Sequence, residues 1–192
     1  MAEAADFAVA LLLGGDARRL PDKLTRPLGT SSLIERAVAF ARSLGPLVLL
    51  GREDQRASSA RYELPFLADA RPHGGPLLAL VGAFERLERP WVLVLAADLP
   101  ALTAEVPQRL LAQRAPGIEA VVPRHSGGIE PLCALYERSA ALRAAATSSA
   151  NEGPRALLER MRVAYVEFPQ AFFRNVNTER DWSQLQEQYH SR

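Results

Sequence analysis

The chain has 192 residues, of which 48% are hydrophobic and 23% charged, so we expect one domain over residues 1–192 with a full hydrophobic core. The formal net charge of +1 gives no reason to expect nucleic acid or an anionic membrane as a partner. No apolar run approaches the roughly 20 residues of a membrane span, and the acidic first residues do not resemble a signal peptide, so we expect a cytoplasmic protein.

The first predicted strand, residues 7–13, is an apolar run that ends at Gly14 and Gly15. Three cations follow it: Arg18, Arg19 and Lys23. Glycine allows a backbone turn with positive φ, and Arg and Lys donate charge-assisted hydrogen bonds to phosphate oxygens. The segment therefore predicts a triphosphate-binding loop, with an ordinary solvated loop as the alternative. Its spacing matches neither the P-loop nor the dinucleotide-binding fingerprint.

Helices and strands alternate along the rest of the chain. Ser32 and Glu35 form a capping box ahead of a helix that ends at Gly45, and Thr103 and Thr178 are expected to cap two later helices. The apolar runs predict strands at residues 47–50, 64–67, 91–97, 118–122, 130–136 and 163–168. The remaining patterns predict helices at residues 33–44, 53–61, 77–88, 104–114, 137–146, 154–161 and 179–189. This alternation implies an α/β fold with a mainly parallel central sheet covered on both faces.

Glycine or aspartate follows several of these strands, at Gly14, Gly51, Asp69 and Asp98. Ligands bind at the carboxyl ends of parallel strands, so we expect one crevice to collect these residues. Asp98 follows an all-apolar strand and is our candidate Mg²⁺ ligand, because Mg²⁺ prefers one or two carboxylates plus substrate phosphates. The alternative is that Asp98 caps a turn. Asp69 would bind a base or sugar or join the metal, or else be a solvated loop carboxylate.

Two amides, Asn175 and Asn177, alternate around Val176 in a segment predicted to be extended. Side chains two residues apart on an extended chain face the same side, which suits substrate recognition. The alternative is turn formation ahead of Thr178.

The histidines and the cysteine give weaker indications of a functional site. His73 and His125 lie in predicted loops with no partner at metal-ligand spacing, and we expect both at the surface. Cys133 is the only cysteine, which excludes an intrachain disulfide and a multi-cysteine metal site, and we expect it in the core.

Five stretches, in chain order, resemble the molybdenum cofactor guanylyltransferases, which are nucleotidyltransferases with a three-layer Rossmann-like fold. They are Leu12-Leu13-Gly14-Gly15 with Arg19 and Lys23, Asp69 with Gly75-Pro76-Leu77, Asp98-Leu99-Pro100, residues 130–136, and Asn175-Val176-Asn177-Thr178. The first and third occur in many sugar and cofactor nucleotidyltransferases. The last, beside Pro131-Leu132, indicates the molybdenum cofactor branch.

The resemblance implies an enzyme that joins GTP to molybdopterin, releases pyrophosphate and uses Mg²⁺ as its cofactor. The implied nucleotide-binding residues are Leu12, Leu13, Gly14, Gly15, Lys23, Asp69 and Asp98. The implied catalytic residues are Arg19, Lys23 and Asp98, with Asp98 as the Mg²⁺ ligand, and Asn175 and Asn177 would lie near the pterin phosphate. Other proteins of molybdenum cofactor biosynthesis, or molybdoenzymes, are the protein partners that such an enzyme would have.

The chain also departs from the family pattern. Pro21 lies in a shortened stretch between Arg19 and Lys23, although Pro has no N–H and cannot adopt positive φ as glycine does. Ala79 replaces the second glycine of the family's Gly-Pro-Leu-Ala-Gly stretch, and we identify no polar residue for the base near Gly51. The alternative functions are a related nucleotidyltransferase that uses CTP or a sugar or polyol phosphate, and a nucleotide-binding protein with weakened catalysis.

Overall fold

An eight-stranded sheet forms the centre of the computed structural model, which describes residues 6–14, 20, 22–69, 75–149 and 152–190. Its strands are β1 (Phe7–Leu12), β4 (Leu47–Gly51), β5 (Phe66–Ala68), β6 (Trp91–Ala96), β7 (Ala120–His125), β8 (Gly128–Ile129), β9 (Ala134–Glu137) and β10 (Val163–Glu167). They lie in the order β10-β7-β9-β6-β1-β4-β5, and β8 pairs with β7. Along this path only β9 is antiparallel to its neighbours, which confirms the predicted, mainly parallel sheet.

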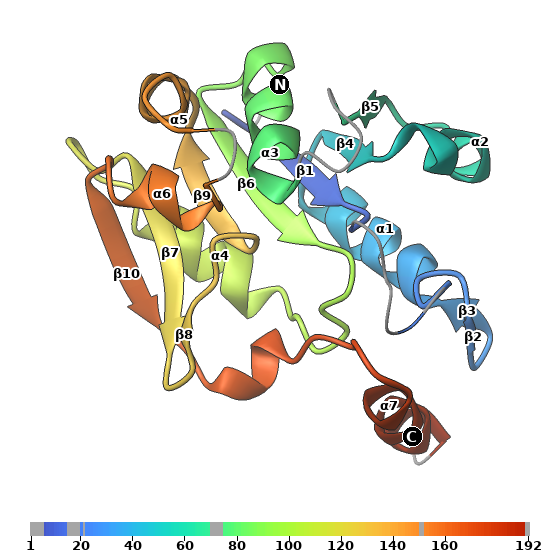
Figure 1. Cartoon of the computed structure of the whole chain (residues 1–192). Helices are drawn as coiled ribbons and strands as arrows, with labels where there is room; N and C mark the ends of the chain where they lie inside the picture. The colour runs from blue at the N-terminus through green and yellow to red at the C-terminus, as the bar shows by residue number, and fades with distance from the viewer. Residues whose placement is uncertain (1–5, 15–19, 21, 70–74, 150–151, 191–192) are drawn as a thin grey trace, which may run out of the picture.

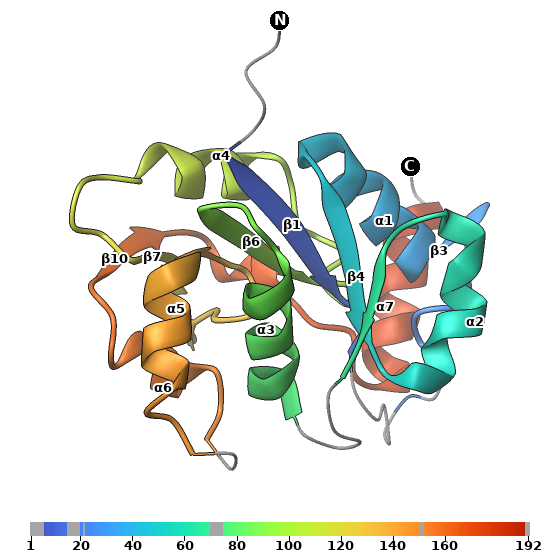
Figure 2. The same cartoon turned by 90° about the horizontal axis from the view of Figure 1, so that it is seen from above.

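Helices cover both faces of the sheet, so the molecule has three layers (Figures 1 and 2). One face carries α1 (Leu33–Leu44) and α4 (Glu105–Ala112), and the other carries α3 (Gly75–Arg86), α5 (Arg138–Ala145) and α6 (Arg155–Leu158). Successive side chains of β1 pack alternately into the two cores, as the two-residue period of a strand requires. Among the described helices, none is long and apolar enough to cross a membrane.

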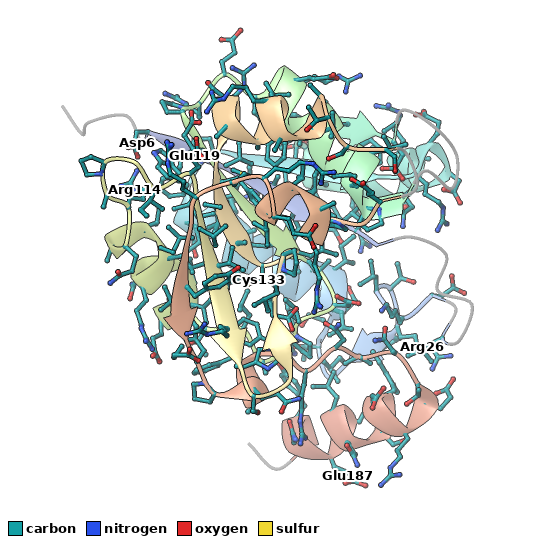
Figure 3. All side chains as sticks on the ribbon, turned by 60° about the vertical axis from the view of Figure 1, so that its left-hand side comes forward. Asp6, Arg26, Arg114, Glu119, Cys133 and Glu187 are labelled. Atoms are coloured by element: carbon teal, nitrogen blue, oxygen red, sulfur yellow. The ribbon has the colours of Figure 1, made fainter. Side chains whose placement is uncertain are left out.

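The last helix, α7 (Glu179–His190), packs against the short hairpin of β2 (Pro27–Leu28) and β3 (Ser31–Ser32). This third apolar cluster contains Leu20, Leu28, Leu33, Val176, Trp182 and Leu185. At its edge Arg26 lies beside α7 (Figure 3), and its guanidinium is 2.7 Å from the Glu179 carboxylate. The cluster therefore fixes the segment before α7 against the chain that follows β1.

Two of the predicted helix caps are confirmed. Ser32 and Glu35 form the expected capping box, with the Ser32 backbone N–H donating to Glu35 at 2.7 Å. The Thr178 hydroxyl accepts from the Asp181 backbone N–H at 3.2 Å. Thr103 was expected to cap α4, and that prediction is wrong: Ala104 is the capping residue, and Thr103 contributes only its backbone oxygen.

Two other predicted elements differ from the structure. Residues 53–61 were expected to be one helix, but they form three short turns, η1 (Glu53–Gln55), α2 (Arg56–Ser59) and η2 (Ala60–Tyr62). The segment is mostly exposed, so no apolar stripe packs a longer helix against the sheet. Residues 130–136 were expected to be extended throughout, but β9 starts only at Ala134, because the Cys133 N–H donates to the Glu130 oxygen at 3.0 Å and closes a turn ahead of the strand.

The side chain of His125 is buried, although the residue as a whole is partly exposed, and this contradicts the expected surface position. Its side chain is only 5% exposed, and its ring stacks on Phe173 with 5.3 Å between the centroids. The Gly127 N–H donates to Nδ1 at 3.0 Å, which leaves Nε2 as the ring nitrogen that donates to Glu130 at 2.9 Å. The ring thereby joins the β7–β8 hairpin to η3 (Gln170–Phe173). His73 lies outside the described residues.

Cys133, in the turn just before β9, is fully buried in the core beneath α1 and α4, as predicted, and Figure 3 labels it. Burial raises the pKa of its thiol well above the ordinary value, so the thiol stays protonated at neutral pH.

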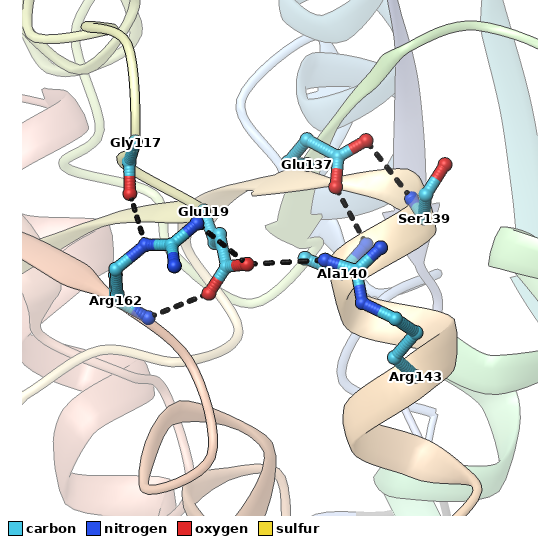
Figure 4. A network of polar contacts seen from close by, with 7 residues as sticks. All are labelled: Gly117, Glu119, Glu137, Ser139, Ala140, Arg143 and Arg162. Carbon is cyan, nitrogen blue, oxygen red and sulfur yellow. Dashed lines mark hydrogen bonds and ion pairs between the residues drawn. The ribbon is translucent and has the colours of Figure 1, made fainter.

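Glu119 joins three elements at the start of β7 (Figure 4). Its carboxylate accepts from the Arg162 backbone N–H at 2.9 Å, from the Arg162 guanidinium at 3.1 Å and from Arg143 of α5 at 3.0 Å. The carboxylate side chain is 14% exposed. The Arg162 N–H bond, helped by both guanidinium charges, lowers the pKa of Glu119 below its ordinary value of 4.5. The ionised carboxylate therefore stabilises the contact between β7, β10 and α5.

Glu119→Gln should lower the free energy of unfolding by about 1 kcal/mol at neutral pH, because charge-assisted hydrogen bonds are lost. A lowered folded-state pKa means that this stabilisation is present above the unfolded-state pKa and disappears as pH falls through the folded-state pKa. The difference between variant and wild type, measured in urea unfolding curves, should therefore shrink as pH falls below the ordinary value of 4.5. Glu53→Gln, at an exposed ion pair, is the matched control and should change nothing. A pH-independent difference for Glu119→Gln would contradict this assignment.

Candidate functional site

A cavity of about 490 Å³ opens at the carboxyl ends of β1, β4, β5 and β6. Among the residues predicted for the site, it is lined by Leu12, Leu13, Gly14, Lys23, Asp69 and Asp98. The register of β1 and β6 pairs Leu12 with Ala96, so the two strands end side by side and deliver Gly14 and Asp98 to one place. Gly15 and Arg19 lie outside the described residues.

The chain leaving β1 turns at Gly14, where φ is +81°. Among the described residues, a Cβ atom built on Gly14 would meet nothing within 4 Å, so the positive φ is the described feature that favours glycine there. The Leu13 N–H donates to the Leu50 oxygen at 2.8 Å, and the Leu12 oxygen accepts from the Ala97 N–H at 2.9 Å. Because the sheet uses these two groups, they are not available to a ligand, and Gly14 is the described residue that continues this wall beyond the sheet.

The N-terminus of α3 forms a second wall of the cavity through Gly75, Pro76 and Ala79. Gly75 has φ +76°, and Pro76 follows it at the start of the helix, where a missing N–H costs nothing. The unpaired N–H groups and the dipole of a helix N-terminus favour an anion. The small side chain of Ala79 leaves the space in front of that N-terminus open.

Lys23 is the centre of the site. Its ammonium donates to the Asp98 carboxylate at 2.6 Å, to the Asn177 side-chain oxygen at 2.9 Å and to the Val176 carbonyl at 3.0 Å. An ammonium group has three protons, so all three are used. The side chains of Lys23 and Asp98 are only 10% and 23% exposed, respectively. Three segments that are distant in the sequence therefore meet at one nitrogen atom.

The segment around Asn177 lies beside the end of β6. The Val176 N–H donates to the Asp98 backbone oxygen at 3.3 Å, and the Val176 side chain is buried in the cluster under α7. Asn175 is exposed. The structure thus brings Asn177 into contact with the residues predicted for the nucleotide, although the two stretches are far apart in sequence.

The oxygens around Lys23 are suited to a hard divalent cation. Mg²⁺ takes carboxylate, amide and carbonyl oxygens, and it usually has few protein ligands because substrate phosphates and waters complete its shell. Within the described ranges no group of three or more His, Cys, Asp or Glu side chains could hold a metal ion. Asp98, with the Asn177 and Val176 oxygens, could hold the predicted Mg²⁺, because these three oxygens already converge on one point, the Lys23 nitrogen.

Asp69 lies at the opposite side of the cavity, next to the end of β4. Its N–H donates to the Gly51 oxygen at 2.9 Å, which continues the pairing of β4 with β5. Burial raises the pKa of the Asp69 carboxyl, and the nearby Arg52 charge opposes that shift in part. Asp69 is thus a partly desolvated acceptor inside the cavity.

Arg52 and Leu132 also line the cavity, and neither was predicted as a site residue from the sequence. Arg52 directly follows the end of β4, as Asp69 directly follows β5, while Asp98 comes two residues after β6. Position at a strand end was therefore the available signal for Arg52. Its guanidinium donates to Asp54 at 2.8 and 3.0 Å. Leu132 comes from the turn before β9. It lies in one of the five stretches that carry the family resemblance, which was the available signal, but it was not assigned to the site.

Comparison with known proteins agrees with this geometry. Residues 9–165 match the family of MobA-like NTP transferase domains. A protein from Carboxydothermus hydrogenoformans named probable molybdenum cofactor guanylyltransferase is 35% identical over 136 residues, which cover 70% of this chain and 67% of the relative. One of the same name from Synechococcus elongatus is 30% identical over 194 residues, covering 94% and 98%.

A solved structure is similar along the whole chain. Molybdopterin-guanine dinucleotide biosynthesis protein A from Archaeoglobus fulgidus is 27% identical, with a TM-score of 0.77, and the match covers 96% of this chain and 100% of that one. The three-layer fold, the five sequence stretches and these relatives all lead to one conclusion. The chain is a nucleotidyltransferase of the MobA-like family and belongs with the molybdenum cofactor guanylyltransferases.

Proposed function

We propose that the protein transfers GMP from GTP to molybdopterin in a Mg²⁺-dependent reaction that releases pyrophosphate. The observation that carries this proposal is the meeting of Lys23, Asp98 and Asn177 beside a cavity at the carboxyl ends of the parallel strands. Phosphoryl and nucleotidyl transfer need positioned cations and fixed dipoles more than they need a nucleophilic side chain. The relatives named as guanylyltransferases support the choice of guanine and of the pterin.

The chemistry is an in-line attack by the terminal phosphate oxygen of molybdopterin on the α-phosphorus of GTP. A new P–O bond forms as the bond between the α-phosphorus and the bridging oxygen breaks, and pyrophosphate leaves with that bond's electron pair. The attacking phosphate is already anionic, so no protein base is needed. The cavity would hold the nucleotide between Gly14, the α3 N-terminus and Asp69, with Lys23 neutralising the triphosphate.

Asp98 would hold Mg²⁺ together with the Asn177 and Val176 oxygens, and the ion would supply charge neutralisation at the transferring phosphate. Asn177 would also orient the pterin phosphate relative to the end of β6, with Asn175 on the same segment. Asn175 and Asn177 would act by orienting the pterin phosphate, because the buried side chain of Val176 fixes the segment that carries them.

The direct test is pyrophosphate release from purified protein supplied with molybdopterin, Mg²⁺ and one nucleoside triphosphate at a time. Release and formation of the guanine dinucleotide are expected with GTP. Activity with CTP alone, or with a sugar phosphate in place of the pterin, would replace the guanylyltransferase assignment by one of the related reactions. Binding of GTP without turnover would identify a nucleotide-binding protein.

Asp98→Asn should lower the rate of transfer about a hundredfold or more, because the variant keeps the side-chain shape but loses the charge that holds Mg²⁺. High Mg²⁺ concentrations should restore part of the rate. Steady-state rates at several Mg²⁺ concentrations test this, beside a melting curve that checks folding. A folded variant with the wild-type rate and metal dependence would remove Asp98 from the metal site.

Asp69→Asn should raise the KM for GTP by about tenfold, because the partly buried carboxylate is expected to accept hydrogen bonds from the nucleotide. Its melting temperature should not fall, since burial disfavours the charged carboxyl and the amide removes that cost. The matched control is Asp6→Asn, which removes the partner of Arg114 at the other end of β1 (Figure 3). Equal KM values for the two variants would show that Asp69 does not contact the nucleotide.

A further inference from the structure

Lys23 is the only lysine in the sequence, and every other residue counted among its 23 basic side chains is an arginine. The two types are not interchangeable where one atom must donate in three directions. An ammonium is a compact point charge with three rotatable donors on a flexible stem, whereas a guanidinium is a flat fork. The one lysine occurs where three oxygens surround one nitrogen.

The three partners of Lys23 are the same oxygens that fit a divalent cation. Mg²⁺ binds its ligands at about 2.0–2.1 Å, whereas the Lys23 nitrogen lies 2.6–3.0 Å from these oxygens. An ion that draws the three oxygens in around itself needs the space that the ammonium fills. The two cations therefore exclude each other.

Charge balance also indicates that Lys23 and a divalent cation exclude each other. The ammonium neutralises the Asp98 carboxylate in a setting where both side chains are largely buried. A divalent ion added beside Lys23 would leave an excess of positive charge in a poorly solvated place, which is costly. A triphosphate removes the excess, because it offers Lys23 several anionic oxygens in the adjoining cavity.

We propose that Lys23 occupies the cation site of the nucleotide-free protein, and that a divalent cation binds there only when Lys23 leaves, a step that the triphosphate favours because it accepts the Lys23 ammonium. Lys23 thus makes cation binding depend on the nucleotide. The inference rests on the proposed function for the triphosphate as the acceptor of Lys23. The competition between the ammonium and the cation concerns the protein and metal alone.

The first test measures Mn²⁺ binding to nucleotide-free protein by calorimetry or electron paramagnetic resonance. Lys23→Met should bind Mn²⁺ about tenfold or more tightly than wild type, because a like charge is removed at contact distance. Adding Asp98→Asn to Lys23→Met should abolish the gain. Arg26→Met removes one charge from a surface pair and is the matched control, with no expected change. Equal or weaker binding by folded Lys23→Met, or no binding by either protein, overturns the proposal.

The second test uses the wild type and needs no substitution. Because Lys23 is the only lysine, its side chain and the chain's α-amino group are the only amines that reductive methylation can modify. Methylation of Lys23, followed by mass spectrometry, should be slow without metal and should accelerate as Mn²⁺ alone saturates the site. Saturation by Mn²⁺ with Lys23 still protected would overturn the proposal. Both tests omit nucleotide and pterin, so either result leaves the transfer assay to decide the proposed function.

Discussion

The contact of one ammonium with three oxygens is the constraint on which the site depends. Lys23 follows β1, Asp98 follows β6, and Asn177 precedes α7. The three residues come from separate parts of the chain, so only the tertiary fold brings them together. A nearly buried cation is stable only when its protons are matched by acceptors, and all three are matched. The same contact therefore links the first strand, the central strand and the last helix of the chain.

The sheet topology explains why that contact can form. β1 and β6 are neighbours in register, so their ends, and the residues that follow, lie side by side. The antiparallel strand β9 enters the sheet on the other side of β6, and the turn before it brings Leu132 to the cavity. The cluster under α7 buries Val176 and holds the Val176 oxygen and Asn177 against Lys23. Apolar packing under α7 thus holds the polar groups around Lys23 in place.

The two sides of the cavity differ in their electrostatics. Around Lys23 a carboxylate, an amide and a carbonyl compensate one cation. On the other side burial raises the pKa of the Asp69 carboxyl, and the charge of Arg52 offsets that rise only in part. A highly charged group suits the first side and the N-terminus of α3, whereas a hydrogen-bonding group suits the second. This division agrees with a ligand that carries phosphates at one end and a base or sugar at the other.

The sequence by itself determined the elements and the positions that follow them. Apolar runs such as Phe7–Leu12 and Trp91–Ala96 and the cap at Ser32 are local signals, and the placement of Gly14, Asp69 and Asp98 at the strand ends follows from the parallel sheet. Only the tertiary structure decided the rest. The burial of His125 comes from the aromatic ring of Phe173, which is distant in the sequence. The pairing of Lys23 with Asp98, Val176 and Asn177 joins positions more than 70 residues apart, and no local pattern encodes which oxygens will share one proton donor.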